Sequence, residues 1–201
     1  MVSVGGPALA PEVAQELPTA SVFAALHLEA AQEAAEAFRS KTYHISVTDD
    51  VVGVEYCTVV KNVAAIGMGI LDGLGKVSGF AYRNAKSALF AQAFREITLL
   101  VTALGGRPET VSGLAGLGDM LVTSLGGRNR LYGELLGEGA HPDTALSELE
   151  ARGMTVEGVD SAQETHRLAE GRGLDLPFLE QVHRILFEAA PAASVLDCLK
   201  G

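Results

Sequence analysis

The chain is poor in the residues that build disulfide frameworks and large aromatic cores. Its 201 residues include two cysteines and no tryptophan, and aromatic residues make up 5%. Two cysteines are too few for a disulfide framework, so we expect a reducing, cytoplasmic setting. No uninterrupted apolar run reaches the roughly 18 residues that cross a bilayer, and the N-terminus lacks the pattern of a signal peptide. These absences predict a cytoplasmic globular protein without a membrane span.

Basic residues and metal-binding patterns are also scarce. The chain has 15 lysines and arginines against 25 acidic residues, a net charge of -10. A nucleic-acid-binding protein presents a basic face, so we expect no nucleic-acid partner, and an anionic ligand would need a local cluster of cations. No pair of histidines or cysteines has metal-ligand spacing, so no metal site is predicted. We interpret each histidine as an ordinary surface or core residue: His27, His44, His141, His166 and His183.

The first 48 residues alternate short strands with helices. Strands are predicted at 2–4, 19–24 and 43–47, and helices at 12–17 and 28–38. Such alternation usually belongs to a larger parallel sheet, and three strands with two helices make a thin domain. The exposed edge and uncovered face of a partial sheet favour self-association.

The remainder, 49–201, is predicted to be entirely helical. Helices are expected at 50–71, 82–104, 109–125, 128–137, 142–151, 159–171, 177–189 and 191–199. The run Thr48-Asp49-Asp50 is typical of an N-terminal cap for the first of them. The predicted fold class is therefore mainly α: an all-helical domain preceded by a short α/β segment of about three strands.

One lysine stands in the middle of the most apolar helix. Burying the Lys61 ammonium is costly, so this side chain is snorkelling, paired, or placed there for chemistry. Burial also lowers the pKa of an amine, which makes a lysine a usable base near neutral pH. Lys61 is therefore the best catalytic candidate, whereas Cys57, one turn earlier, is interpreted as a small buried hydrophobe.

The segment 113–130 is rich in glycine and ends in two arginines. A helix is predicted to end near Leu125, the double glycine that follows reverses the chain, and Arg128 opens the next helix. Free N–H groups and the guanidinium groups of Arg128 and Arg130 at a helix start form a natural phosphate site. An ordinary turn with solvated arginines fits the sequence equally well. No glycine run in the chain matches a P-loop or a dinucleotide fingerprint.

Four motifs occur in the order and spacing of NAD-dependent glycerol-3-phosphate dehydrogenases. They are 60–63 (VKNV), 84–89 (NAKSAL), 113–119 (GLAGLGD) and 126–130 (GGRNR), and 156–159 (VEGV) resembles a later cofactor-contact motif. The chain resembles that family from about Val2 to its C-terminus. The resemblance implies that 1–48 is the tail of a nicotinamide-binding Rossmann domain and 49–201 the helical substrate domain. It also implies that sn-glycerol 3-phosphate and dihydroxyacetone phosphate are interconverted with NAD or NADP.

The resemblance assigns roles by position. Lys61 is expected to be the general base, which takes the proton from the C2 hydroxyl as hydride leaves for nicotinamide. The expected substrate-binding residues are Asn62, Asp119, Thr123, Arg128 and Asn129, with the last two as a phosphate clamp. The expected cofactor contacts are Gly6, Ala10, Arg128 and Glu157. Simpler interpretations stay open: Asp119 as a helix cap or partner of an arginine, Glu157 as a surface carboxylate, and Lys86 as a solvated helix lysine.

The chain also departs from the family pattern. It lacks the first strand, the glycine-rich pyrophosphate turn and a second active-site lysine, and Ala8 stands where the family has serine. We therefore expect weak or absent NAD affinity and little turnover from the chain alone. Its partner would be a complementing N-terminal domain, encoded just upstream of Met1 with a Gly-x-Gly-x-x-Gly turn, or a second copy in a homodimer. The alternatives are a non-catalytic phosphate-binding or oligomerisation module and, less favoured because of the GGRNR motif, another β-hydroxyacid-type dehydrogenase.

Overall fold

The computed structural model describes residues 1–200 and confirms a mainly helical chain with a small three-stranded sheet. It forms two compact units. The first comprises Met1–Lys61 with Ile97–Val122, and the second comprises Asn62–Glu96 with the chain from Thr123 onward. The strands and helices up to the long third helix are β1 (Ser3–Gly5), α1 (Ala10–Ala14), β2 (Thr19–Ala24), α2 (Leu28–Phe38), β3 (Tyr43–Thr48) and α3 (Val51–Ser78).

The rest of the chain adds helices only, as the sequence predicts. They are α4 (Arg83–Ala103), α5 (Pro108–Ser112), the π-helical turn η1 (Leu114–Gly118), α6 (Asp119–Leu125), α7 (Arg128–Gly137), α8 (Pro142–Ala151), α9 (Glu157–Glu170), α10 (Pro177–Phe187) and the 3₁₀ segment η2 (Ala192–Leu199). The predicted bounds of α2, α7 and α8 are confirmed to the residue.

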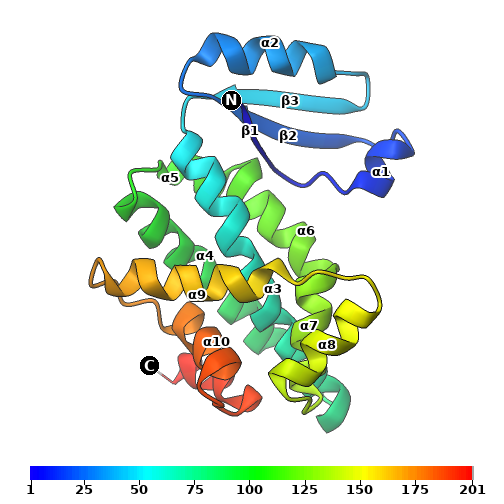
Figure 1. Cartoon of the computed structure of the whole chain (residues 1–201), viewed down its shortest axis with the longest axis vertical. Coiled ribbons are helices and arrows are strands. Elements are labelled where there is room, and N and C mark those ends of the chain that lie inside the picture. Colours follow the sequence, from blue (N-terminus) through cyan, green and yellow to red (C-terminus); the bar gives the residue numbers. More distant parts are fainter. Residues whose placement is uncertain (201) are drawn as a thin grey trace. The chain divides into compact units, whose positions relative to one another are not determined.

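The sheet of the first unit has the order β1-β2-β3. Strand β1 runs antiparallel to β2, and β2 runs parallel to β3, with Thr19 opposite Tyr43. Because parallel neighbours need a crossover, α2 joins β2 to β3 and covers one face of the sheet (Figure 1). The small core between them consists of Phe23, Ala25, Ala31, Ala35 and Ile45.

Three predicted helices differ by more than two residues from the observed ones, and one of them, expected at 50–71, continues to Ser78 as α3. The helix expected at 12–17 spans Ala10–Ala14 instead, since Pro11 occupies its first turn and Glu16 adopts a left-handed φ of 56°. The single helix expected at 109–125 is broken into α5, η1 and α6. At Gly116 a side-chain Cβ would lie 2.0 Å from the carbonyl oxygen of Val111, so the chain turns back here too closely for a regular continuous helix.

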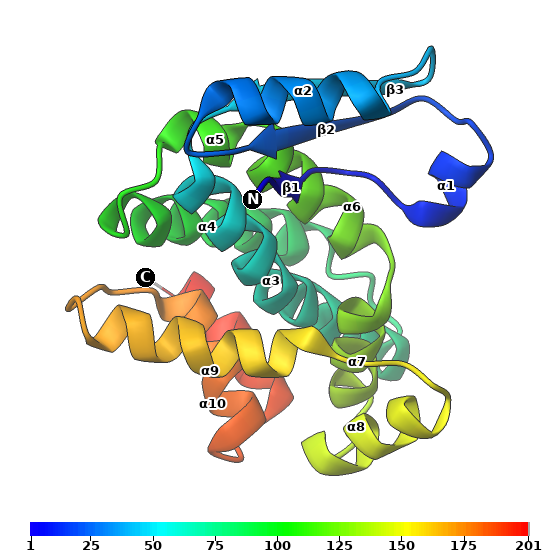
Figure 2. The ribbon, with the colours of Figure 1, turned by 45° about the horizontal axis from the view of Figure 1, so that its top comes forward.

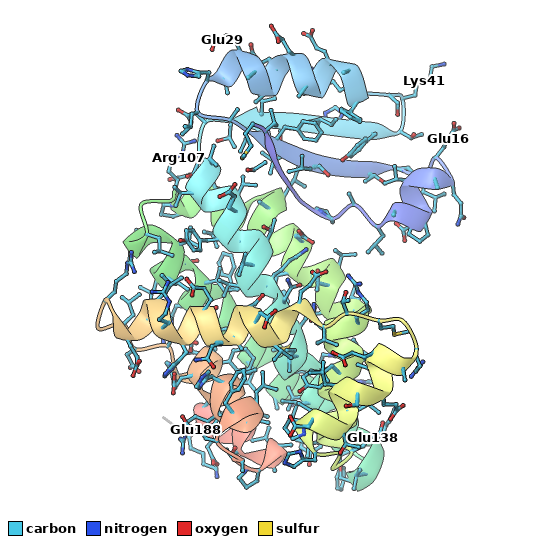
Figure 3. The ribbon with its side chains drawn as sticks, in the orientation of Figure 1. Glu16, Glu29, Lys41, Arg107, Glu138 and Glu188 are labelled. Atoms are coloured by element: carbon cyan, nitrogen blue, oxygen red, sulfur yellow. The ribbon has the colours of Figure 1, made fainter. Side chains whose placement is uncertain are left out.

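The predicted cap of α3 is confirmed and has a wider role. The Asp50 carboxylate accepts the backbone N–H of Gly53 at 2.9 Å, which is the N-cap bond, and also that of Arg107 at 2.8 Å. It accepts the Thr110 hydroxyl at 2.6 Å as well. The Arg107 side chain, labelled in Figure 3, bonds the carboxylate of Asp49. One buried carboxylate thus ties the start of α3 to α5.

Asp50 predicts how the stability of the first unit depends on pH. Burial by itself raises the pKa of Asp50, but the hydrogen bonds from Thr110, Arg107 and Gly53 outweigh it and lower the pKa. A folded pKa below the unfolded value stabilises the fold above about pH 3.9, and this stability is lost as the pH falls through the folded pKa. We expect Asp50→Asn to cost about 1–3 kcal/mol at pH 7. Urea unfolding at a series of pH values from 7 to 2.5 measures the free energy of unfolding of both proteins. The difference between Asp50→Asn and the wild type should shrink as the pH falls, and a constant difference would contradict this account.

The second unit contains an unusually close helix pair. The C-terminal half of α3 packs on α7 through Gly69 and Gly73 on one side and Gly133 and Gly137 on the other. A Cβ at Gly133 would lie 2.0 Å from the carbonyl oxygen of Ile66, and the other three positions are similarly tight against backbone. Glycine is therefore required at this contact because it lets the two backbones meet directly.

A second buried carboxylate, that of Glu96, binds the N-terminus of α10. The α10 helix has no side-chain cap of its own, and Glu96 of α4 accepts the backbone N–H groups of Phe178 and Leu179, each at 2.9 Å. Burial raises the pKa of Glu96 above its usual value. A negative group at a helix N-terminus is favourable, so Glu96 fixes the position of α10 within the second unit.

Helix α3 is long and apolar enough to cross a membrane by length and composition. Its most apolar window is 72% buried, as expected for the core helix of a globular protein, which passes the same test. This helix is weak support for a membrane span.

Candidate active site

Lys61 is paired with a carboxylate. In the first unit its Nζ lies 2.7 Å from Oδ1 of Asp119, which opens α6, and the two side chains are 19% and 6% exposed. The other oxygen, Oδ2, accepts the backbone N–H of Gly6 at 3.2 Å. The structure therefore shows Lys61 as paired rather than snorkelling. Asp119 fixes the direction of the ammonium group, and the lysine side chain remains partly accessible.

The two predicted cofactor positions near the N-terminus differ in their surroundings. Gly6 has a left-handed φ of 124° and joins the Lys61–Asp119 pair through its N–H group. This φ is one that only glycine adopts readily. Ala10 lies exposed at the start of α1.

A second polar group lies in the second unit. Asn129 donates from Nδ2 to Oδ1 of Asn62 at 3.0 Å, and its own Oδ1 accepts the backbone N–H of Gly158 at 2.8 Å. Both asparagines are buried, and a Cβ at position 158 would lie 2.7 Å from Oδ1 of Asn129. The close approach of Gly158 therefore fixes both amides. Thr123, also predicted for the site, is half-buried in α6.

Arg128 is held at the start of α7 by polar partners on the chain around α9. Its guanidinium donates to Oγ1 of Thr155 at 2.8 Å and to Oε1 of Glu157 at 3.0 Å. The arginine is still 48% exposed, so its charge is accessible to an anion. Two predicted residues, Arg128 and Glu157, are thus direct partners. Thr155 and Gly158 were missed from the sequence, although Gly158 lies within the VEGV motif.

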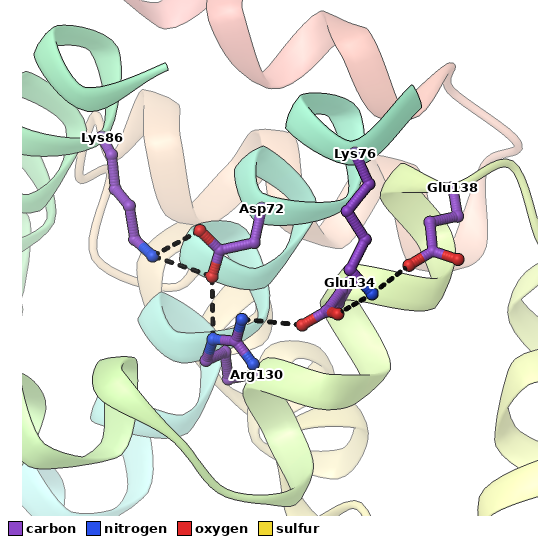
Figure 4. A network of polar contacts seen from close by, with 6 residues as sticks. All are labelled: Asp72, Lys76, Lys86, Arg130, Glu134 and Glu138. Atoms are coloured by element: carbon purple, nitrogen blue, oxygen red, sulfur yellow. Dashed lines mark hydrogen bonds and ion pairs between the residues drawn. The ribbon is translucent and has the colours of Figure 1, made fainter. Parts of the chain in front are cut away.

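Arg130, the second arginine of the possible anion site, is paired with carboxylates. Its Nε lies 2.7 Å from Asp72 and its Nη2 lies 2.7 Å from Glu134. Lys86 also bonds Asp72, at 2.7 and 2.8 Å, so it is not a solvated helix lysine. Figure 4 shows these groups in one network, which continues from Glu134 through Lys76 to Glu138. Since carboxylates already neutralise its charge, Arg130 has a structural role between α3 and α7.

Cys57 is no nucleophile. It is buried one turn before Lys61, and burial, followed by the nearby carboxylates of Asp50 and Asp119, raises the pKa of its thiol to about 12. The thiolate, which is the reactive form, is therefore suppressed at neutral pH. The interpretation of Cys57 as a small buried hydrophobe is confirmed.

Comparison with known proteins agrees with these motifs. The family model described as "NAD-dependent glycerol-3-phosphate dehydrogenase C-terminus" matches residues 50–197. The NADP(+)-dependent glycerol-3-phosphate dehydrogenase of Archaeoglobus fulgidus is 37% identical over 196 residues, which cover 97% of this chain and 58% of that protein. The glycerol-3-phosphate dehydrogenase [NAD(P)+] of a Thermoanaerobacter species is 40% identical over 190 residues, 94% of this chain and 55% of that protein.

Solved structures show the same relationship. The crystal structure of glycerol-3-phosphate dehydrogenase from Coxiella burnetii superposes with a TM-score of 0.90 at 37% identity, over 99% of this chain and 59% of that one. Glycerol-3-phosphate dehydrogenase from Saccharomyces cerevisiae superposes with a TM-score of 0.85 at 27% identity, over 98% and 59%. The chain thus spans somewhat more than half the length of the relatives it matches. It belongs to the NAD-dependent glycerol-3-phosphate dehydrogenase family.

Proposed function

We propose that this chain supplies the substrate-side residues of a nicotinamide-dependent enzyme that interconverts sn-glycerol 3-phosphate and dihydroxyacetone phosphate. The observation that carries the proposal is the Lys61–Asp119 ion pair, set in a helix whose neighbouring Cys57, Val60 and Ala64 are buried and apolar. A paired, partly accessible lysine in such surroundings is suited to hold and move a proton.

Lys61 has the central chemical role in this proposal. In its amine form Nζ takes the proton of the C2 hydroxyl, and in the reverse direction its ammonium returns that proton to the carbonyl oxygen of dihydroxyacetone phosphate. Asp119 orients Nζ and is itself held by the Gly6 N–H group. A nicotinamide held beside this site would supply the acceptor for the hydride that leaves C2.

The other predicted residues bind and orient. Arg128 and Asn129 are proposed to clamp the substrate phosphate, which the accessible guanidinium of Arg128 and the fixed amide of Asn129 support. Asn62 and Thr123 are proposed to orient the glycerol part. For the cofactor, we propose that Gly6, Ala10, Arg128 and Glu157 contact NAD or NADP. The half-exposed guanidinium of Arg128 would meet the cofactor's negative charge.

We also propose the organisation and setting of the protein. A nucleotide-binding part and a helical substrate domain would meet near residue 49, and the partner would be a complementing nucleotide-binding segment or a second copy. A cytoplasmic location agrees with two free cysteines and no disulfide among the described residues. The alternative function is a non-catalytic phosphate-binding module that retains the clamp without turnover.

Calorimetry with sn-glycerol 3-phosphate on the folded chain tests the clamp. We expect saturable binding, weakened at least about 10-fold by Arg128→Ala, because a charge-assisted hydrogen bond contributes about 1.5–3 kcal/mol. Arg172→Ala, which removes an equally cationic but exposed side chain, is the matched control and should bind normally. Absence of heat from a folded chain, or equal loss in both variants, would refute the clamp. Binding without NAD(P)H-dependent turnover, even when a nucleotide-binding segment is added, would favour the non-catalytic alternative.

A further inference from the structure

Two histidines that are far apart in the sequence meet between α9 and α10. The rings of His166 and His183 stack with centroids 3.9 Å apart and planes 10° from parallel. The two helices lie side by side in both ribbon views (Figure 1 and Figure 2). Glu180 stands one turn before His183 on α10, and its Oε2 lies 2.7 Å from Nδ1 of His166. One ligand atom from each of these residues lies within 4.8 Å of the others.

His183 is a buried histidine whose ring nitrogens make no hydrogen bond to any described residue. Only 5% of the residue is exposed. Leaving a buried donor or acceptor unsatisfied is energetically unfavourable. Such a group in a folded protein calls for an explanation, and a bound ion is one of the few that satisfy a buried imidazole. Phe187 packs against the ring at 4.9 Å, so this side of the histidine is apolar.

The charges around the rings favour a cation. Oε2 of Glu170 lies 3.5 Å from Nε2 of His166, and Oε1 of Glu188 lies 3.9 Å from Nδ1 of His183. Glu188, labelled at the end of α10 in Figure 3, also pairs with the basic side chain of Arg184. With Glu180, three carboxylates face two imidazoles and one guanidinium. A divalent ion would therefore bring the local charge closer to balance.

We propose that His166, Glu180 and His183 form a binding site for a divalent transition metal of the Zn²⁺ type. Two imidazoles and one carboxylate are a ligand set that zinc accepts, with a fourth position left for water or a second carboxylate. The ion would fasten α9 to α10, and none of its ligands is among the residues assigned to the reaction, so its role is structural. Because stacked rings direct their lone pairs in parallel, binding requires one imidazole to turn out of the stack.

Zinc titration of the whole chain, in competition with a chromophoric chelator, tests the site. We expect one ion per chain and a rise in melting temperature with Zn²⁺. His166→Ala and Glu180→Gln should each weaken zinc binding at least about 10-fold, since each removes a direct ligand. His141→Ala is the matched control, because His141 lies exposed beside Asp143 in the same unit and is no part of the cluster. The His166 and Glu180 side chains are 19% and 39% exposed, so both variants are expected to fold. His183 is left unchanged because a substitution at this buried position could prevent folding.

Cobalt spectroscopy gives a second readout that identifies the ligands. Co²⁺ in this site should show visible bands of a nitrogen and oxygen ligand set without the charge-transfer band of a thiolate, which excludes Cys57 and Cys198 as ligands. The bands should vanish in His166→Ala and persist in His141→Ala. The proposal is overturned if zinc does not bind saturably, or if the cluster variants bind it as tightly as the control.

Discussion

Under the proposed function, Lys61→Arg is expected to lower kcat/KM for dihydroxyacetone phosphate by about 10²–10⁴-fold when the chain acts together with a nucleotide-binding segment, with little loss of stability. A guanidinium keeps the ion pair with Asp119 but does not give up its proton near neutral pH, so it cannot act as a base. The rate of NAD(P)H oxidation measures the effect. Retention of the wild-type rate in Lys61→Arg would contradict the role of Lys61 as the proton-transfer group.

Lys61→Met separates the chemical role from the structural one. Methionine has a similar length but no charge, so it should lose turnover and also leave the buried Asp119 without its cation. We therefore expect a lower midpoint of urea unfolding for Lys61→Met than for Lys61→Arg. Lys41→Met is the matched control, because Lys41 lies exposed between α2 and β3 and should change neither quantity (Figure 3). Equal unfolding midpoints of the two Lys61 variants would show that the ion pair does not contribute to stability.

Gly133→Ala is expected to destabilise the second unit by about 3 kcal/mol or more. Overpacking a core usually costs about 1–3 kcal/mol, and here the added methyl would lie 2.0 Å from the carbonyl oxygen of Ile66. A backbone oxygen in a helix cannot turn aside as a side chain can, so α3 and α7 must separate. That separation would disturb the Arg130–Asp72 bond between the same two helices, which adds to the loss.

Urea unfolding of Gly133→Ala beside Gly126→Ala provides the comparison. A Cβ at Gly126 meets nothing within 4 Å, and Gly126 is not among the left-handed glycines. Alanine there should leave stability unchanged or raise it slightly, by up to about 1 kcal/mol, through its effect on the unfolded chain. The same unfolding midpoint for both variants would refute the close contact between α3 and α7.

The sequence predicted best those elements whose signals are local. Helices α2, α7 and α8 begin and end where apolar spacing and the Gly and Pro positions indicate. The prediction failed at 109–125, because the break there comes from the contact between Gly116 and Val111. It also ended α3 too early, although the helix continues to Ser78 and stops at Gly79, whose φ is 77°.

The candidate site divides in the same way. The motifs around Lys61, Arg128 and Glu157 could be recognised from the order of residues, and they sufficed to identify the family. The sequence did not predict which residue pairs with each charged side chain. Arg128 and Arg130 are two residues apart and look alike in the sequence, yet one remains accessible beside Glu157 and the other is neutralised by Asp72 and Glu134.

The sequence by itself determined most of the helices and the family, and it singled out Lys61 as the candidate for proton transfer, because periodicity, capping residues and motif spacing act over short stretches of chain. Only the tertiary structure decided that Lys61 is held by Asp119, that Asn129 is fixed by Gly158, and that His166 stacks on His183. Each of these pairs joins residues from 17 to 58 positions apart. Contacts over such separations depend on how helices pack, and no local pattern of residues encodes that packing.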